Sequence, residues 1–167
     1  MKQNKNNIIN LTYSLQRDND IEIIPKIYKY SSYYKIDFKP EKLLNQNENE
    51  YYCTRANKDE YITFKFSEEY CFNLIAITFT TSYKESKLKK FKISVFDINE
   101  TFLRSYIYTF DSYENRKEII KMNDKGAYLK FDFLENFGED YFCIKRIQFF
   151  VDISHSINVT QFSINIE

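Results

Sequence analysis

The sequence is poor in glycine, proline and histidine and contains no tryptophan. It holds two glycines, two prolines and one histidine. A loop that cradles phosphate groups needs several glycines within a few residues. Gly126 and Gly138 stand alone, so a loop of that kind is excluded. We expect both glycines to supply positive φ angles in turns.

The single histidine, His155, limits the chemistry that the chain can carry. It excludes an HExxH motif and any metal centre built from several histidines. No GxSxG motif and no local cysteine signature accompanies it, and its setting, "DISHSIN", is typical of a hairpin loop. Carboxylates are numerous, and a sequence cannot show whether two of them have glycosidase geometry, but a random acidic pair rarely does. We therefore predict no catalytic residue, no metal site of this kind and no enzyme activity.

Cysteine is also scarce, with Cys53, Cys71 and Cys143 as the three examples. The odd number, and an N-terminal segment without the apolar run of a secretory signal, argue against a disulfide framework. We expect Cys71 and Cys143 to be small core residues. No apolar run approaches the about 18 residues that span a membrane. These features predict an intracellular protein without membrane insertion.

The chain carries no excess of either charge, with 24 basic and 24 acidic residues. Nucleic-acid-binding domains usually present a net basic face, so a nucleic-acid partner is disfavoured. A local basic run extends from Lys84 to Lys92. We interpret it as the solvated flank of a hairpin.

What the sequence does contain is a repeated two-residue alternation of apolar and polar side chains. In "YITFKF", for example, Ile62, Phe64 and Phe66 fall on one face. Such alternation indicates strands with one buried and one wet face. Two shorter runs near Ile21 and Ile27 precede seven longer ones, at residues 61–66, 73–81, 90–97, 102–110, 127–134, 144–151 and 159–167.

The predicted fold is all-β, an antiparallel β-sandwich or barrel. We expect one domain over residues 21–167, preceded by an extended or briefly helical lead at 1–20. Residues 31–60 have no sustained period. Within them "FKPEKLLNQ" predicts a helical turn that places Leu43 and Leu44 in the core.

The chain from Tyr30 onward resembles the galactose-binding-like superfamily, also known as the discoidin or coagulation-factor C-type fold. The resemblance rests on the pair Ser31–Ser32, the turn "EKLLNQ", the segment "EYYCTRANKDEYITFKF" and the strand "LKKFKISVFD". It implies a jelly-roll sandwich. Within the superfamily, the chain resembles the DOC-type subunit of the anaphase-promoting ubiquitin ligase, the small β-sandwich subunit of intraflagellar transport and an X-ray repair scaffold domain. The C-terminal half also resembles the inner-junction family of ciliary microtubules.

The resemblance implies a binding site in loops at one end of the sandwich. The "NENEYYCTR" loop would lie there beside the Ser31–Tyr34 and Ser154–Asn158 loops. One of the paired tyrosines would plug the core and the other would contact a partner, with Arg55 as a forked hydrogen-bond donor. The predicted partner-binding residues are Ser31, Ser32, Tyr51, Tyr52, Thr54, Arg55, Ser154 and His155.

The leading functional prediction is a non-catalytic protein-binding subunit of a larger intracellular assembly, of the ubiquitin-ligase or ciliary type. Its partners would be the other protein subunits, and the resemblance implies a location in the cytoplasm or the cilium, with the nucleus as an alternative. A lectin-like carbohydrate-binding module is one alternative, although a glycan partner is disfavoured, and a DNA-repair scaffold is the other. No cofactor is expected, and a structural calcium near Asn45 and Asn47 is the one case left open.

Overall fold

The computed structural model describes residues 20–47 and 49–152. Ser154, His155 and the expected last strand at 159–167 lie outside the described residues, and the domain boundaries stay a prediction. The described part contains nine strands and three short 3-10 helices: β1 Asp20–Ile23, β2 Lys26–Tyr30, η1 Ile36–Phe38, η2 Pro40–Leu44, β3 Tyr52–Cys53, β4 Glu60–Thr78, η3 Lys84–Ser86, β5 Leu88–Phe96, β6 Phe102–Thr109, β7 Lys117–Asn136, β8 Cys143–Ile144 and β9 Arg146–Asp152.

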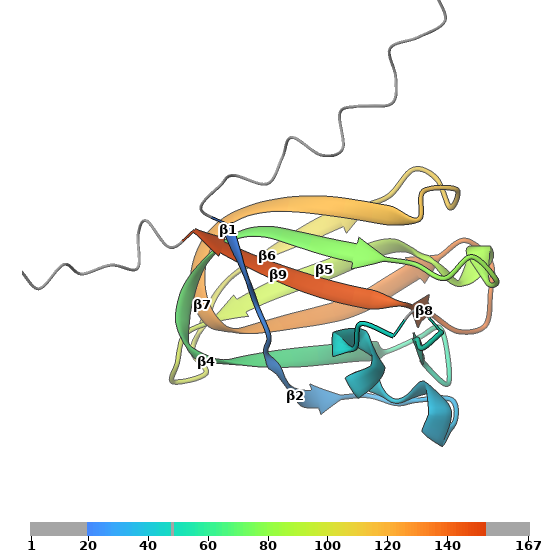
Figure 1. Ribbon diagram of the computed structural model, residues 1–167, viewed down its shortest axis with the longest axis horizontal. Coiled ribbons are helices and arrows are strands. Elements are labelled where there is room, and N and C mark those ends of the chain that lie inside the picture. The colour runs from blue at the N-terminus through green and yellow to red at the C-terminus, as the bar shows by residue number, and fades with distance from the viewer. Residues whose placement is uncertain (1–19, 48, 153–167) are drawn as a thin grey trace, which may run out of the picture.

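Strands β4 and β7 are long enough to belong to both layers of a sandwich (Figure 1). The first part of β4 pairs with β2 and with the second part of β7, which continues to β5 and β6. The second part of β4 pairs with β9 and with the first part of β7, and β1 lies beyond β9. All pairs are antiparallel, so the prediction of an antiparallel all-β sandwich is confirmed.

The core lies between the two layers and is dominated by phenylalanine. The ring of Phe64 in β4 lies 4.9 Å from that of Phe149 in β9 and 5.6 Å from that of Phe131 in β7. All three side chains are fully buried. Each buried ring of this size stabilises the fold by about 1.5–3 kcal/mol, and tilted ring pairs add about 0.5–1.5 kcal/mol. Leu43 in η2 is also fully buried and Leu44 packs against this core, as the sequence predicts.

The sequence pattern finds the strands but not their continuity. The runs at 61–66 and 73–81 belong to the single strand β4, whose register with β7 shifts between Lys65 and Tyr70. This irregularity bends the strand from one layer into the other. The first half of β7 was not predicted. Its buried positions do alternate, but they include Asp124, which hides the apolar pattern.

The two glycines have different roles. Gly138 adopts a φ of 137° in the turn after β7, as expected. The prediction of a turn is wrong for Gly126, which lies inside β7. A Cβ atom there would come within 2.6 Å of Val95 Cγ1 and 2.9 Å of the Phe96 carbonyl oxygen. Glycine is therefore required at this position because β5 approaches β7 closely.

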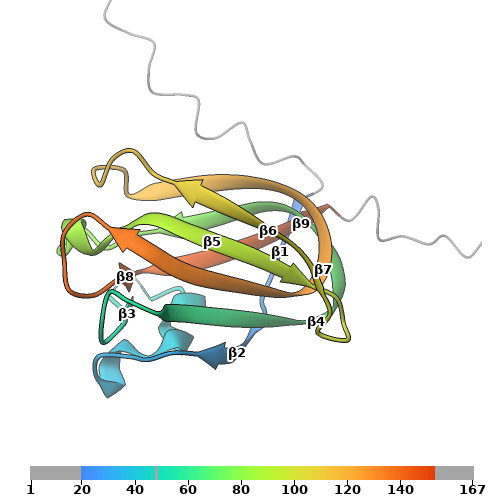
Figure 2. The ribbon, with the colours of Figure 1, turned by 180° about the vertical axis from the view of Figure 1, so that it is seen from behind.

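Four loops gather at one end of the sandwich: β2–β3, β4–β5, β6–β7 and β7–β8 (Figures 1 and 2). Asp20 and Asp152, the first and last described residues, pair with each other at the opposite end. Within residues 20–47 and 49–152, no helix is both long and apolar enough to cross a membrane. The four loops therefore lie at the opposite end of the sandwich from the first and last described residues.

Candidate functional site

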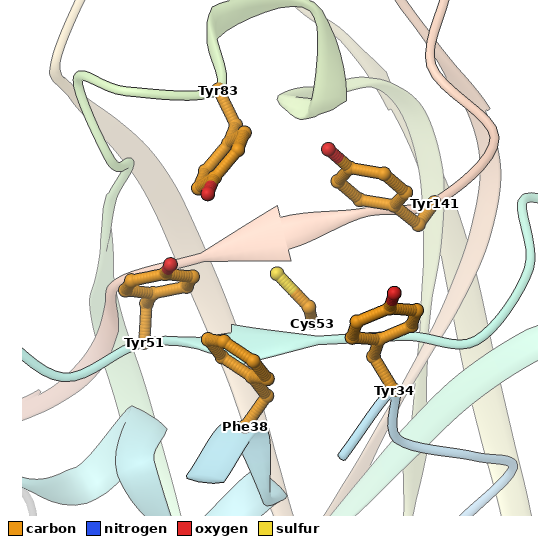
Figure 3. A pocket seen from close by; sticks show the side chains of 6 residues that line it. All are labelled: Tyr34, Phe38, Tyr51, Cys53, Tyr83 and Tyr141. Carbon is orange, nitrogen blue, oxygen red and sulfur yellow. The ribbon is translucent and has the colours of Figure 1, made fainter.

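Five aromatic rings form a closed circuit around a pocket at the loop end (Figure 3). Going around the circuit, the ring centroids of Tyr34 and Phe38 are 6.1 Å apart, those of Phe38 and Tyr51 are 5.0 Å apart and those of Tyr51 and Tyr83 are 5.9 Å apart. The circuit closes through Tyr141, at 6.2 Å from Tyr83 and 6.5 Å from Tyr34. We call this cavity, with Cys53 at its base, the aromatic pocket.

The aromatic pocket is small and mostly apolar. Its volume is about 200 Å³, below the roughly 300–1,000 Å³ of pockets for drug-sized ligands. The polar side-chain groups that line it are the hydroxyls of four tyrosines, and Figure 3 shows those of Tyr51 and Tyr83 pointing toward each other. The pocket therefore suits one ligand ring with an apolar face and hydroxyl groups at its edge.

The rings come from segments that are far apart in the sequence. Tyr34 and Phe38 belong to the β2–β3 connection, Tyr51 immediately precedes β3, and Tyr83 immediately precedes η3. Tyr141 lies in the β7–β8 loop. The Tyr34 amide donates a hydrogen bond to the Cys53 carbonyl oxygen at 2.9 Å, which fixes the first segment against β3.

A disulfide between Cys53 and Cys143 lies beneath the pocket. It joins β3 to β8, which pair in register at these two residues. The expectation that the cysteines form no disulfide is therefore wrong, whereas Cys143 is fully buried in the core as the sequence predicts. Two cysteines that are 90 residues apart in the sequence meet because β3 and β8 are neighbours in the fold. Cys71 stays free and half-buried.

The two tyrosines of the pair occupy different positions, and the structure bears out the core-plug role for one of them. Tyr52 is fully buried, and its hydroxyl donates to the Ser32 carbonyl oxygen at 2.9 Å. Burial raises the pKa of its phenol, and the nearby Glu60 carboxylate adds to the rise. Tyr52 is thus the core plug. Tyr51 faces the aromatic pocket instead.

The buried carboxylate of Glu60 holds the predicted serine pair beside the β3 segment. It accepts hydrogen bonds from the Ser31 hydroxyl, from Ser32 Oγ at 2.6 Å and from the Ala56 amide at 3.2 Å. Ser32 Oγ in turn accepts from the Arg55 amide at 2.9 Å. The structure therefore brings Ser31 and Ser32 to the 51–55 loop as expected, but as supports of the loop rather than as lining of the aromatic pocket.

The other predicted site residues lie outside the aromatic pocket. Thr54 is buried, where its hydroxyl donates to the Ala56 carbonyl oxygen and accepts from the Phe142 amide. Arg55 is exposed and does not line the pocket. Ser154 and His155 lie outside the described residues, so their expected place beside the 51–55 loop was not tested.

The turn considered for calcium is held by its own side chains. Asn45 Nδ2 donates to Glu50 Oε2 at 2.6 Å, and Asn47 Oδ1 accepts from the Asn49 amide at 3.1 Å. In the described ranges, no three side chains from His, Cys, Asp and Glu gather as metal ligands would. These hydrogen bonds hold the shape of the turn, and the structural calcium considered there stays untested.

Sequence reasoning missed Phe38, Tyr83 and Tyr141 as pocket residues, and it treated Tyr34 only as the end of a loop. The chain has 15 tyrosines and 16 phenylalanines, so an aromatic residue in a loop does not stand out. The available signal was position, because Tyr83 and Tyr141 each lie in a connection between two apolar strands. Four of the five rings carry a hydroxyl group, which is typical of contact surfaces with one apolar and one wet side.

Tyr51 should resist ionisation in the folded protein. Burial raises its pKa from about 10 to about 12, and a hydrogen bond with Tyr83 contributes. The neutral phenol therefore stabilises the fold fully below pH 10, and this contribution is lost as the pH rises toward 12. In a titration of tyrosinate absorbance, Tyr51→Phe should remove one ionisation near pH 12. Removal of an ionisation near pH 10 would contradict the burial of this phenol.

No family model matches the chain, and no curated protein matches it. Solved structures do. A fucose binding module from Streptococcus pneumoniae is 14% identical with a TM-score of 0.65, and the match covers 81% of this chain and 99% of that one. The family 32 CBM of C. perfringens NanJ, in complex with galactose, is 14% identical with a TM-score of 0.65 and coverages of 78% and 98%. A putative chitobiase fragment from Bacteroides thetaiotaomicron is 11% identical with a TM-score of 0.69 and coverages of 84% and 97%.

These likenesses establish the fold and correct the functional prediction. The chain has the galactose-binding-like β-sandwich fold that the sequence resemblance implies. The leading prediction of a protein-binding subunit of a larger assembly is wrong, because the similar solved structures include a fucose binding module and a CBM in complex with galactose. The ubiquitin-ligase and ciliary resemblances are not confirmed. The same finding overturns the expectation that a glycan partner is disfavoured, so the carbohydrate-binding alternative is the better supported one.

Proposed function

We propose that this chain is a carbohydrate-binding module that holds one sugar ring in the aromatic pocket. The closed circuit of five aromatic rings at the loop end is the observation that carries the proposal. The glycan-binding modules that share the fold support it. In sandwiches of this kind, loops at one end carry binding while the sheets act as the scaffold.

The chemistry of the aromatic pocket matches that of a sugar. One face of a pyranose ring presents C–H groups, which pack against aromatic rings by dispersion and by the loss of apolar surface to water. The edge of the sugar presents hydroxyl groups, which both donate and accept hydrogen bonds. A tyrosine supplies an apolar ring and a hydroxyl group together, and four of the five rings are tyrosines.

We propose further that the module binds without transforming its ligand, as the sequence predicts. The side chains that line the aromatic pocket are those of tyrosine, phenylalanine and cysteine. Glycoside hydrolysis usually needs two carboxyl groups that flank the scissile bond, and the lining supplies neither. Incubation of the protein with a glycan that it binds should therefore release no free sugar.

Replacing Tyr83 by alanine should weaken glycan binding about ten- to a hundredfold, because a buried ring face contributes about 1.5–3 kcal/mol. Tyr83 is 38% exposed, so the fold should tolerate its loss. A glycan array would identify the ligand, and isothermal titration would measure the loss of affinity. Tyr83→Phe should lose less, because it keeps the ring.

Tyr28 provides the matched control for this experiment. It is a tyrosine of similar exposure, 37%, in β2 and outside the aromatic pocket. Tyr28→Ala should bind the same glycan as tightly as the unmodified chain. Equal losses in the Tyr28 and Tyr83 variants, or no glycan bound by the unmodified chain, would refute the proposed function.

The cellular location expected from the sequence has not been tested, and the disulfide supports a different proposal. Structural disulfides persist in oxidising compartments and are rare in the cytosol. We propose that the module works in an oxidising environment, where the bond between Cys53 and Cys143 stays intact. Mass spectrometry of the protein from its native source, alkylated before reduction, should label Cys71 but not this pair.

A further inference from the structure

A second cavity lies beside the aromatic pocket at the loop end. Its volume is about 190 Å³. We call it the polar pocket, because hydroxyl, amide and charged groups dominate its lining. The β4–β5 loop contributes Thr80, Thr81 and Lys84, and the β6–β7 loop contributes Glu114, Asn115 and Arg116.

The two pockets share one wall. Tyr83 lines the aromatic pocket, and the next residue, Lys84, lines the polar pocket. Figures 1 and 2 show the β4–β5 loop between the β6–β7 loop and the β3–β8 pair. A ligand with two neighbouring sugar units can therefore place one unit in each pocket across the Tyr83–Lys84 segment.

Two cationic side chains line the polar pocket, and one of them has no ionic partner among the described residues. Lys84 Nζ lies 3.0 Å from Glu114 Oε2, so these two charges neutralise each other. Arg116 makes no ion pair and no side-chain hydrogen bond with any residue that the structure describes. Its guanidinium is therefore free to bind a ligand. A guanidinium presents a planar fork of donors that matches carboxylate and sulfate oxygens in pairs.

A buried lysine holds together the two loops that form the polar pocket. Lys87 Nζ, which follows η3, donates to the Ser112 carbonyl oxygen at 2.7 Å and to the Asn115 carbonyl oxygen at 3.1 Å. It also pairs with Glu118 Oε1 at 2.8 Å. Because Lys87 belongs to the β4–β5 connection and the two carbonyl groups belong to the β6–β7 loop, both walls are held before any ligand arrives. The Phe79 amide adds a hydrogen bond to the Arg116 carbonyl oxygen at 2.8 Å.

We propose that the polar pocket binds an anionic group of the glycan, a carboxylate or a sulfate, through the Arg116 guanidinium. The proposal rests on the proposed function, because the aromatic pocket holds the sugar unit next to the charged one. The module is then selective for acidic glycans. Three observations carry the inference. They are the polar pocket itself, the hydrogen bonds that hold its two loops together, and an arginine without an ionic partner among the described residues.

The anion site can be tested without knowing the glycan. Sodium sulfate is titrated into the ¹⁵N-labelled protein at constant ionic strength, and the arginine Nε–H signals are followed by NMR. The Arg116 signal should shift and saturate, together with the amides of Thr80 and Thr81. The shift should disappear in Arg116→Gln and persist in Lys117→Gln, which removes a neighbouring exposed charge outside the cavity. Shifts that do not saturate, or that follow Lys117, would overturn the proposal.

The glycan selectivity is tested with matched probes. The glycan identified for the aromatic pocket is prepared in three forms that differ in one substituent on the neighbouring unit: neutral, sulfated and carboxylated. Each acidic form should bind about tenfold more tightly than the neutral form, and added salt should reduce this preference. Arg116→Gln should lose the preference and keep the affinity for the neutral form. The sulfated and carboxylated forms separate the two sources of charge.

The outcomes distinguish this inference from the proposed function. Equal binding of all three forms by the unmodified chain overturns the inference and leaves the carbohydrate-binding function in place. A chain that binds no glycan in any form overturns both. A preference that survives Arg116→Gln shows that the charge is recognised elsewhere, and this outcome also overturns the inference.

Discussion

Replacing both Cys53 and Cys143 by alanine lowers the free energy of unfolding by about 2–5 kcal/mol. The disulfide closes a loop between residues that are 90 positions apart. Removing the link gives the unfolded chain many more conformations, and the cost grows with the length of the loop. Chemical denaturation of the double variant and the unmodified chain would measure the difference. Chemical reduction of the unmodified chain should produce a loss of the same size.

Cys71→Ala is the control for this prediction. Cys71 is free and half-buried, so its replacement should cost much less than loss of the disulfide. Since Cys53 lies at the base of the aromatic pocket, the double variant should also lose affinity for its glycan under conditions where it remains folded. A double variant as stable as the unmodified chain would contradict the link between β3 and β8.

Replacing Lys87 by methionine should destabilise the protein by about 3–5 kcal/mol, because it leaves the partners of a buried charge without compensation. The Lys87 side chain is 1% exposed. Its ammonium lies between the rings of Phe79 and Phe110, at 4.9 and 5.3 Å from their centroids. Methionine keeps much of the volume, so the loss reports on the charge and its hydrogen bonds. Thermal and denaturant unfolding would both measure it.

Two further variants separate this effect from a general effect of lysine. Lys84→Met removes an exposed ion pair, with side chains 47% and 61% exposed, and should cost less than about 1 kcal/mol. Adding Glu118→Leu to Lys87→Met should recover part of the lost stability, since it removes the carboxylate left unpaired. If Lys84→Met and Lys87→Met cost the same, the buried network does not hold the two loops.

Much of the fold could be predicted from the sequence because burial alternates along the strands. Ile62, Phe64 and Phe66 fall on one face in the sequence and are all buried in the structure. The bend of β4 could not be predicted in this way. Alternation reports which face is buried but not which layer receives it, and the polar residues between Phe66 and Tyr70 look like a turn between two separate strands.

The candidate site could be predicted only where it is local. The pair Tyr51–Tyr52 lies within the segment that it helps to form, whereas Ser32, at a sequence separation of 20 from Tyr52, was placed beside it by the family resemblance. The disulfide and the aromatic circuit depend on contacts between distant segments, such as β3 with β8 and Tyr83 with Tyr141. No spacing along the chain encodes these contacts. Apart from Tyr51, which lines the aromatic pocket, the residues with a recognisable sequence pattern support the loop, whereas the rest of the pocket lining comes from tertiary packing.

Because Asp20 pairs with Asp152, the two ends of the described chain lie together, and this limits how the domain can be attached to a support. These two residues are the first residue of β1 and the last residue of β9, at the end of the sandwich opposite the four loops (Figure 1). Anchoring the module to a bead or a carrier at either point leaves its pocket pointing outward. With the glycan-binding function proposed above, several copies displayed on one carrier would engage neighbouring sugars of a polysaccharide at once. Because later contacts then form at high effective concentration, dense display would convert weak single-site binding into tight adhesion.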